Sequence, residues 1–301
     1  MHQPEISIGI PFYSNIKFLK HAIESVLRQS NPRWSLTIYD DGKASEKTLE
    51  LVQAFKDPRI KYFKNPQNLG MARNWSQCII KAESDLITIL HADDELLPNY
   101  TELMNQTAQL FPEASAFFCE AKIIDSEGND HFSFPDYYKK FLTPKSNSNT
   151  YVLENETSVD QLLKGNFIMC PTLCYRKSQL ISQSFSNDWK MVLDLDFTTR
   201  LLMNGKKIIG IREKAYAYRR HTENATSQYT DTLLRFEEEK KIYIDLHTRL
   251  IEKGWLNAAK TAKKQRIILL NLLFCLMKDL LKLRGKNFLK KLKFILRSFE
   301  K

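Results

Sequence analysis

Residues 86–95, LITILHADDE, form an apolar, partly β-branched run that stops on the adjacent carboxylates Asp93 and Asp94. Such a run, with Pro98 soon after it, is typical of a buried strand whose carboxyl end opens into a loop. In an open α/β sheet, ligands bind outside these strand ends, so acids placed there can hold a metal ion and an anion. The alternative is a solvated turn, because Asp is also a common turn and capping residue.

A second acidic pair ends an earlier strand-like run in the same way. Asp40 and Asp41 follow residues 36–39, LTIY, as Asp93 and Asp94 follow the later run. Because the carboxyl ends of parallel strands meet at one edge of a sheet, two strands that end alike favour a shared ligand site over two unrelated turns.

The order of elements predicts an α/β fold followed by helices. Short β-rich runs alternate with amphipathic segments over the first 120 residues, as in parallel strands joined by crossover helices. Strands are expected at residues 6–10, 36–39, 60–63, 86–90, 114–119, around 174–175 and 207–211, and helices at 15–29, 45–55, 70–82, after 98, and at 198–203. The aromatic stretch 132–141 is expected to leave the sheet, or to be a loop packed on the body. From about residue 222 the sequence is helical.

Length and composition fit a globular protein. With 301 residues and 43% apolar content the chain can bury a substantial core. Its five cysteines are scattered, with no Cys-x-x-Cys pair, so neither a disulfide framework nor a zinc site is predicted. The first residues show no basic segment ahead of an apolar stretch, so we expect the catalytic part to be cytoplasmic.

The positive charge is concentrated at the C-terminal end. Residues 255–301 hold thirteen Lys and Arg against two acids, a net charge of +11, so the whole-chain value of +10 leaves −1 for residues 1–254. These bases alternate with Leu and Ile rather than with exposed stacking aromatics, which disfavours a nucleic-acid partner.

Six short motifs follow one another along the chain in a recognisable order. They are residues 8–14 (IGIPFYS), 39–42 (YDDG), 68–74 (NLGMARN), 92–94 (ADD), 194–197 (DLDF) and 218–221 (YRRH). Over about residues 5–228 this set resembles the family 2 glycosyltransferases, which are inverting sugar-nucleotide enzymes with the GT-A fold. Lys43 and Leu193 depart from the family pattern, and the Gln-x-x-Arg-Trp signature of processive synthases is absent, which favours addition of one sugar per encounter.

The resemblance implies a metal site and a catalytic base. Asp94 corresponds to the direct ligand of Mn²⁺ or Mg²⁺, Asp93 to its ribose-side neighbour, and His221 to a late histidine that approaches the metal or pyrophosphate. A hard cation offsets the charge of a departing diphosphate. A carboxylate must also take the proton of the acceptor hydroxyl. The motif assigns this role to Asp194, with Asp196 as a capping or packing partner.

The remaining motif residues are expected to bind the nucleotide. Asp41 corresponds to the residue that accepts the imide proton of uracil or thymine, and Pro11 and Tyr13 line the base. Arg73 reaches the same pocket, or else forms a salt bridge with Asp40 or Asp93. Arg219, with its neighbour Arg220, either neutralises the phosphates or lies on the surface.

The C-terminal region predicts a peripheral membrane helix. Its longest apolar run, residues 267–277, is shorter than the ~20 residues that span a bilayer. Over residues 288–301 an apolar face opposes a cationic one. The apolar face holds Phe288, Leu292, Ile295 and Phe299, flanked by Leu289 and Leu296, and the cationic face holds Lys290, Lys293, Arg297 and Lys301. This pattern suits an anionic membrane surface, or a helix docked on the protein with a basic outer face.

Together these patterns predict a GT-A catalytic domain (residues 1–230) with a helical, basic extension (residues 231–301). The expected activity is metal-dependent, inverting and non-processive transfer of one sugar from a UDP- or TDP-sugar to a hydroxyl of a glycan. That acceptor is expected to be lipid-linked, in cell-surface polysaccharide synthesis at the inner face of the plasma membrane. The rivals are a nucleotidyltransferase, which would need a Gly-rich phosphate loop near the first strand, and a non-catalytic binding protein on a retired enzyme fold.

Overall fold

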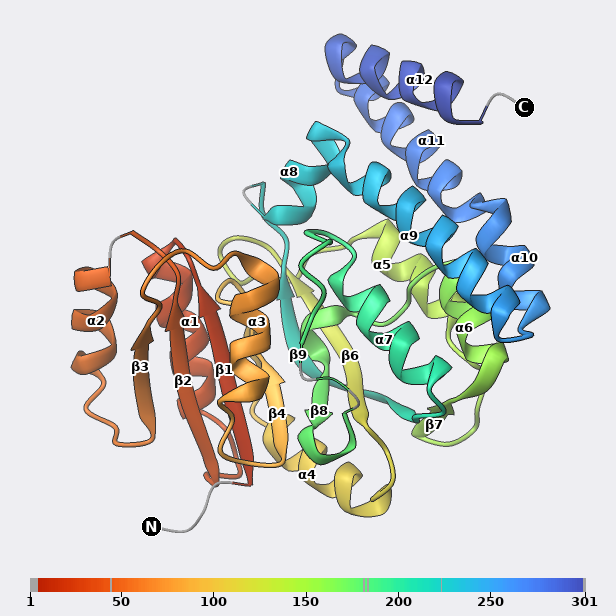
Figure 1. The fold of residues 1–301 in the computed structure, drawn as a ribbon. Coiled ribbons are helices and arrows are strands. Elements are labelled where there is room, and N and C mark those ends of the chain that lie inside the picture. Colours follow the sequence, from red (N-terminus) through yellow and green to blue (C-terminus); the bar gives the residue numbers. More distant parts are fainter. Residues whose placement is uncertain (1–4, 44, 181, 183, 223, 300–301) are drawn as a thin grey trace. The chain divides into compact units, whose positions relative to one another are not determined.

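The computed structural model describes residues 5–43, 45–180, 182, 184–222 and 224–299. The chain forms two compact units, and Figure 1 labels the helices and strands along the sequence. Unit 1 consists of Met1–Asn155, Phe167–Asp188 and Leu193–His221, and unit 2 of Glu156–Asn166, Trp189–Val192 and Thr222–Lys301. The predicted division into a catalytic domain and an extension at residue 230 stays a prediction, because compactness alone does not show which residues act together.

Unit 1 is built on a mixed sheet. Nine strands among the described residues follow the order β3-β2-β1-β4-β8-β6-β9-β5, with β7 paired to β9. They are β1 (Ile6–Phe12), β2 (Trp34–Asp40), β3 (Ile60–Lys64), β4 (Leu86–Ile89), β5 (Glu95–Leu96), β6 (Ala116–Ile124), β7 (Thr150–Leu153), β8 (Cys174–Arg176) and β9 (Ile208–Arg219). Strands β1 to β4 pair in parallel, whereas β8 runs antiparallel to β4 and β6. The predicted α/β fold is confirmed.

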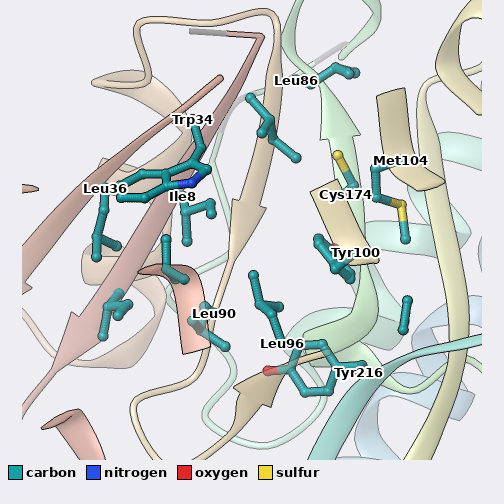
Figure 2. Packing of buried hydrophobic residues seen from close by; sticks show 14 of the residues in the cluster. Ile8, Trp34, Leu36, Leu86, Leu90, Leu96, Tyr100, Met104, Cys174 and Tyr216 are labelled. Carbon is teal, nitrogen blue, oxygen red and sulfur yellow. The ribbon is translucent and has the colours of Figure 1, made fainter. Parts of the chain in front are cut away.

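One face of this sheet carries the main core. The helices of unit 1 are α1 (Ile16–Leu27), α2 (Ser45–Ala54), α3 (Met71–Ile80), α4 (Tyr100–Leu110), α5 (Phe134–Lys139) and α7 (Leu193–Met203). Strand residues alternate between faces, so Ile6, Ile8 and Ile10 of β1 point one way. They are fully buried in one cluster with apolar residues of α1 and α4, and Figure 2 shows part of this packing.

The opposite face holds α3 and α7 through close contacts. A Cβ at Gly9 of β1 would lie 2.7 Å from the Cβ of Cys78 in α3, so only glycine lets this helix approach the sheet so closely. Farther along, the rings of Trp75, Tyr175, Phe185 and Phe197 form a chain of contacts with centroids 4.5 to 5.4 Å apart. This aromatic cluster ties α3, β8 and α7 together.

Several predicted boundaries are corrected by the structure. Strand β9 runs to Arg219, well past the predicted end at residue 211, because its later residues pair with both β6 and β5. Helix α7 begins at Leu193 rather than at residue 198, so both acids of the DLDF motif lie in its first turn. Strands β5 and β7 were not predicted, and part of the aromatic stretch forms helix α5.

Unit 2 is helical in its described residues. It contains α6 (Asn155–Lys164, from Glu156 on), α8 (Ala225–Thr232), α9 (Leu234–Glu252), α10 (Leu256–Lys264), α11 (Arg266–Leu281) and α12 (Gly285–Phe299). The Tyr243 hydroxyl donates to the Leu163 carbonyl at 2.9 Å, which joins α9 to α6. Glu156 accepts from the backbone N–H groups of Asn257 and Ala258, so its carboxylate satisfies the free amides at the start of α10.

No helix in the part of the chain that the structure describes combines the length and the apolar character needed to cross a membrane.

Candidate active site

The first two strands end next to each other, as predicted. The backbone N–H of Asp41 donates to the Phe12 carbonyl at 2.8 Å, so the loop after β2 lies beside the end of β1. A Cβ at Gly42 would lie 2.3 Å from the Tyr13 carbonyl oxygen, so glycine is required for this approach. Pro11 lies in β1, and Tyr13 just beyond the strand is exposed, which leaves its ring available to a ligand.

The carboxylate of Asp41 connects two motifs that are distant in sequence. It accepts the backbone N–H groups of Leu69 and Gly70 at 2.7 and 2.9 Å, and the Asn65 side-chain amide at 2.9 Å. This acid therefore orders the loop before α3, a role that the sequence did not reveal. Arg73 lies in the first turn of α3 and is exposed, and its predicted contact with the nucleotide stays a prediction.

Hydrogen bonds from strand β9 hold the side chain of Asp94 in place. Its side chain is 1% exposed, and it accepts the Arg219 backbone N–H at 2.8 Å and the Tyr216 hydroxyl at 3.1 Å. Both donors lie in the part of β9 that extends past the predicted end of the strand. The added length of β9 therefore holds one of the predicted metal ligands in place.

Asp93 pairs with His221. The Nε2 atom of His221 lies 2.9 Å from the Asp93 carboxylate, and the His221 ring packs against Phe18 with centroids 5.0 Å apart. The structure thus brings together Asp93, Asp94 and His221, three residues that the motifs place in one metal site. Their role as ligands stays a prediction.

The two adjacent acids have opposite pKa shifts. Burial raises the pKa of Asp94 well above its ordinary value, and the charge of Asp93 raises it further. Burial also opposes the charged form of Asp93, but the hydrogen bond with His221 and the two nearby imidazole rings of His91 and His221 favour the carboxylate, so the pKa of Asp93 is lowered. A bound cation would relieve the repulsion between the two carboxylates.

The donor set around these acids fits a divalent cation. One ligand atom each from His91, Asp93 and Asp94 lies within 4.8 Å of the others. The Nε2 atom of His91 is buried and has no hydrogen-bond partner among the described residues, and burial lowers the pKa of His91, which favours the neutral, ligating imidazole. His91 was not among the predicted metal ligands, although it lies in the same HADD run.

Arg219 holds the acidic turn. Its side chain is 1% exposed, and its guanidinium donates to the carbonyls of Asp93, Asp125 and Ser126 and to the Glu95 carboxylate. These acceptors engage all three nitrogen atoms of the guanidinium. The geometry therefore gives Arg219 a role in positioning the acidic turn, in addition to its predicted contact with the nucleotide.

Arg220 connects the site to the aromatic stretch. Its guanidinium donates to both carboxylate oxygens of Asp136 at 2.7 to 2.9 Å, and Asp136 lies in α5. Bidentate pairs of this kind are geometrically specific. Residues 134–139 are therefore joined to the residue that precedes His221.

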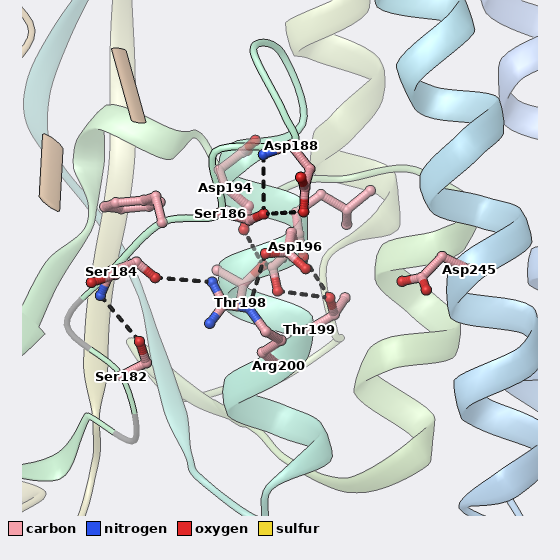
Figure 3. A network of polar contacts seen from close by, with 12 residues as sticks. Ser182, Ser184, Ser186, Asp188, Asp194, Asp196, Thr198, Thr199, Arg200 and Asp245 are labelled. Carbon is pink, nitrogen blue, oxygen red and sulfur yellow. Dashed lines mark hydrogen bonds and ion pairs between the residues drawn. The ribbon is translucent and has the colours of Figure 1, made fainter. Parts of the chain in front are cut away.

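The two acids of α7 lie in different surroundings. Asp196 is 4% exposed and pairs with Arg200 at 2.9 Å, and Arg200 also donates to the Ser184 carbonyl (Figure 3). Asp194 is only partly buried. This geometry fits the packing role predicted for Asp196, while the catalytic role of Asp194 stays a prediction.

The charges of Asp194 and Asp94 both act on the partly buried thiol of Cys170. Burial raises the pKa of Cys170, and the charges of both Asp194 and Asp94 raise it further, whereas Lys139 lowers it. Because such effects fade with distance, Asp194, Asp94 and Lys139 all lie in the neighbourhood of one side chain. The predicted base and the predicted metal ligand therefore share one region of unit 1.

A cavity of about 510 Å³ adjoins this region. Its volume is within the range of small-molecule sites. The lining comes mainly from β6, the segment after it and α5, with further residues from β7, β9 and the segment before Cys170, and includes Phe118, Phe132, Tyr137, Lys139, Tyr151 and Met169. Five aromatic side chains of this segment are exposed, namely Phe132, Phe134, Tyr137, Tyr138 and Phe141. Exposed apolar groups gathered around a cavity mark a binding surface.

The profile of the family described as "Glycosyl transferase family 2" matches residues 7–156, which include the first two acidic pairs. The chain belongs to this family. It is a glycosyltransferase, and the family assignment favours sugar transfer over the nucleotidyl transfer considered above.

Curated relatives support the assignment. The chain is 38% identical over 99 residues to the putative colanic acid biosynthesis glycosyl transferase WcaA of Escherichia coli K12, covering 33% of this chain and 36% of that protein. It is 27% identical over 222 residues to the uncharacterized glycosyltransferase MJ1057 of Methanocaldococcus jannaschii, covering 73% and 72%. The first match thus spans about a third of its relative, and the second nearly three quarters.

Solved glycosyltransferase structures share the fold. S. aureus TarS 1–349 in complex with UDP-GlcNAc is similar with a TM-score of 0.60 and 16% identity, over 80% of this chain and 66% of that one. The mannosyltransferase PcManGT of Pyrobaculum calidifontis, in complex with GDP-Man and Mn²⁺, is similar with a TM-score of 0.57 and 13% identity, over 98% and 86%. Both confirm the predicted GT-A fold.

Proposed function

We propose that this protein is an inverting, metal-dependent, non-processive glycosyltransferase that moves one sugar from a UDP- or TDP-sugar to a hydroxyl of a lipid-linked glycan in cell-surface polysaccharide synthesis. The observation that carries the proposal is the acidic turn after β4, in which Asp93, Asp94 and His91 offer ligand atoms within 4.8 Å of one another, in the same compact unit as Asp194. A metal-binding acid and a second carboxylate in one region match the two requirements of the reaction. These are stabilisation of a leaving diphosphate and removal of a proton from the acceptor.

The chain's own residues divide the work. Asp94 and Asp93 would hold a divalent cation, which would supply positive charge to neutralise the departing diphosphate, and His221 orients Asp93. Asp194 takes the proton of the acceptor hydroxyl as the new glycosidic bond forms. With a single base on the face of the sugar opposite the diphosphate, attack inverts the anomeric carbon. Asp196 keeps the first turn of α7 in place through its ion pair with Arg200.

In this proposal the nucleotide binds at the carboxyl ends of β1 and β2. Asp41 accepts the imide proton of the base while Pro11 and Tyr13 line it. The Oδ2 atom of Asp41 accepts one described hydrogen bond, from Gly70 N–H, so this oxygen retains acceptor capacity. Arg73, in the first turn of the helix that follows, faces solvent and is available to a phosphate or ribose.

A panel of nucleotide sugars tests the proposal. Purified protein is incubated with UDP-, TDP-, GDP- and CMP-sugars with Mn²⁺, with Mg²⁺ or with chelator, and both hydrolysis and thermal shift are scored. We expect a response confined to the UDP- and TDP-sugars and abolished by the chelator. A response to GDP-sugars instead would contradict the pyrimidine assignment of Asp41, and full activity in chelator would contradict the metal role.

We infer that the acceptor occupies the cavity beside α5. Asp136 lines this cavity and pairs with Arg220, the residue before His221, so the cavity lies beside the acidic site. The flat C–H face of a sugar ring packs well on an aromatic ring. The exposed Tyr137, whose ring contacts Phe132 at 6.0 Å and Phe141 at 5.3 Å, offers such a surface.

Replacing Tyr137 with Ala is expected to raise the KM for the glycan acceptor on the order of tenfold, equivalent to about 1.4 kcal/mol of lost contact. Donor hydrolysis in the absence of acceptor should not change. Phe134→Ala is the matched control, because Phe134 lies in the same helix and is exposed but does not line the cavity. Equal effects of the two substitutions on the acceptor KM would contradict this assignment.

We further propose that unit 2 binds the inner face of the plasma membrane. Helix α12 docks on α11 through Lys291, which is 2% exposed and lies 2.6 Å from Asp279, and Phe294 packs against Phe236. These contacts leave Leu289 and Leu296 exposed, as are Leu270, Leu273, Met277 and Leu280 of α11. An apolar surface in a region of net charge +11 suits an anionic bilayer.

Full-length protein is therefore expected to sediment with anionic vesicles at low salt and to be released as salt rises. Each basic residue near the surface contributes ~1 kcal/mol, which salt screens. The double variant Leu289→Glu/Leu296→Glu should stay in the supernatant. Leu110→Glu, at an exposed position of α4, serves as the control and should sediment like the wild type. Failure of the wild type to sediment at low salt would contradict the proposed membrane binding. Helix α12 would then be a helix that docks on the protein.

A further inference from the structure

The side chain of His91 lies beside the acidic pair without a hydrogen bond to either acid. Its Nδ1 atom lies 3.8 Å from the Asp94 carboxylate, and its buried Nε2 has no partner among the described residues. The ring instead packs on Trp75, with centroids 4.9 Å apart and an interplanar angle of 36°. Trp75 in turn belongs to the aromatic cluster that joins α3, β8 and α7, so the imidazole sits on a rigid support.

The distance from His91 to Asp94 is informative. At 3.8 Å it is too long for a hydrogen bond. It is close to the separation of two ligands on one cation, about 3 to 3.5 Å for bonds of about 2.1 Å. Together with Asp93, these side chains offer one nitrogen and two oxygen ligands within 4.8 Å of one another.

His221 is engaged differently. Its Nε2 atom already lies 2.9 Å from the Asp93 carboxylate, and its ring packs on Phe18. A histidine that hydrogen-bonds a ligating carboxylate orients that ligand. The geometry therefore separates the two histidines, because His91 lies beside Asp94 without a hydrogen bond between their side chains, whereas His221 is hydrogen-bonded to Asp93.

We propose that His91 supplies a nitrogen ligand to the bound cation and thereby makes the site prefer Mn²⁺ and other first-row transition-metal cations over Mg²⁺. Mg²⁺ strongly favours an octahedron of oxygen atoms and retains its water, whereas imidazole nitrogen suits transition metals. The inference rests on the metal-dependent function proposed above and goes beyond it, because it names a ligand and a metal preference.

Pulsed electron paramagnetic resonance with Mn²⁺ and UDP tests the ligand directly, without turnover. The wild type, labelled with ¹⁵N-histidine, should show nitrogen coupling to bound Mn²⁺. The coupling should vanish in His91→Asn and persist in His221→Asn, the matched control. Persistence in His91→Asn with loss in His221→Asn would overturn the proposal and assign the nitrogen ligand to His221.

Calorimetry of the metal preference gives a second, independent readout. His91→Asp exchanges the nitrogen ligand for oxygen, so the ratio of Mg²⁺ to Mn²⁺ dissociation constants, measured with UDP present, should fall at least ~tenfold. If both metals bind the wild type equally and no nitrogen coupling appears, the inference fails while the proposed metal-dependent function stands. If neither metal binds the wild type, the metal dependence of that function fails as well.

Discussion

The Asp94→Ala variant is expected to lose metal-dependent nucleotide binding and turnover while keeping its fold. Asp94 is almost fully buried in the acidic turn, and its truncation removes one of the two carboxylates that we propose bind the cation. Calorimetry with UDP and Mn²⁺ should show metal-dependent binding for the wild type and none for the variant. Undiminished metal-dependent affinity in the variant would remove Asp94 from the metal site.

Asp94→Asn separates the charge from the structural contacts of this residue. The amide oxygen can still accept the Arg219 backbone N–H, and the amide N–H₂ can donate to the Tyr216 oxygen. Because the folded state raises the pKa of Asp94, its ionisation weakens the metal-free fold as pH rises above the ordinary Asp range. At neutral pH the metal-free Asn variant should therefore have a Tm equal to or above that of the wild type. It should nevertheless show no metal-dependent binding of the nucleotide.

Local sequence pattern was sufficient for the first half of the sheet. Strands β1 to β4 are short apolar runs with clear turn signals, and each predicted strand overlaps the observed one. The pattern was insufficient for β9, because residues 212–214 are charged and read as the end of a strand. Pairing with β6 and β5 overrides that local signal, with register shifts around Glu120 that absorb the irregularity.

The proximity of the candidate site residues was predictable where short sequence motifs contain them. The order of motifs brought Asp93, Asp94 and His221 into one prediction, and the structure places them together. It was not predictable where function depends on contacts between distant segments. The bonds from residues 69 and 70 to Asp41, and the packing of His91 on Trp75, depend on tertiary geometry that no single segment encodes.

Arg219 illustrates the same limit. From the sequence, its position in the YRRH motif suggested either a contact with phosphate or a place on the surface, and its burial shows that the surface alternative is wrong. In the structure its backbone fixes Asp94 and its guanidinium binds the carbonyl of Asp93, so it shapes the acidic turn. Burial is the quantity that distinguishes these roles, and the sequence around residue 219 gives no signal for it.

Asp194→Asn is expected to lower turnover by ~10²-fold or more with little change in donor affinity. General-base contributions are typically of this size and arise only in the transition state. The amide keeps the shape of the side chain but cannot accept the acceptor's proton. Initial rates at saturating donor and acceptor give the loss in kcat, and calorimetry with UDP and Mn²⁺ checks donor affinity. The acid limb of the pH profile of kcat/KM should also disappear, which a purely structural role would not cause.

Asp196→Asn provides the matched comparison within the same helical turn. Asp196 is buried and paired with Arg200, so its substitution should lower the Tm by leaving the guanidinium without its carboxylate. The fraction that remains folded should keep the acid limb of the pH profile, because Asp194 is still present. A loss of turnover and of that limb in Asp196→Asn, with near-normal turnover in Asp194→Asn, would reverse the assignment of the base. A collapse of stability in both variants would instead assign both acids to the structure of the first turn of α7.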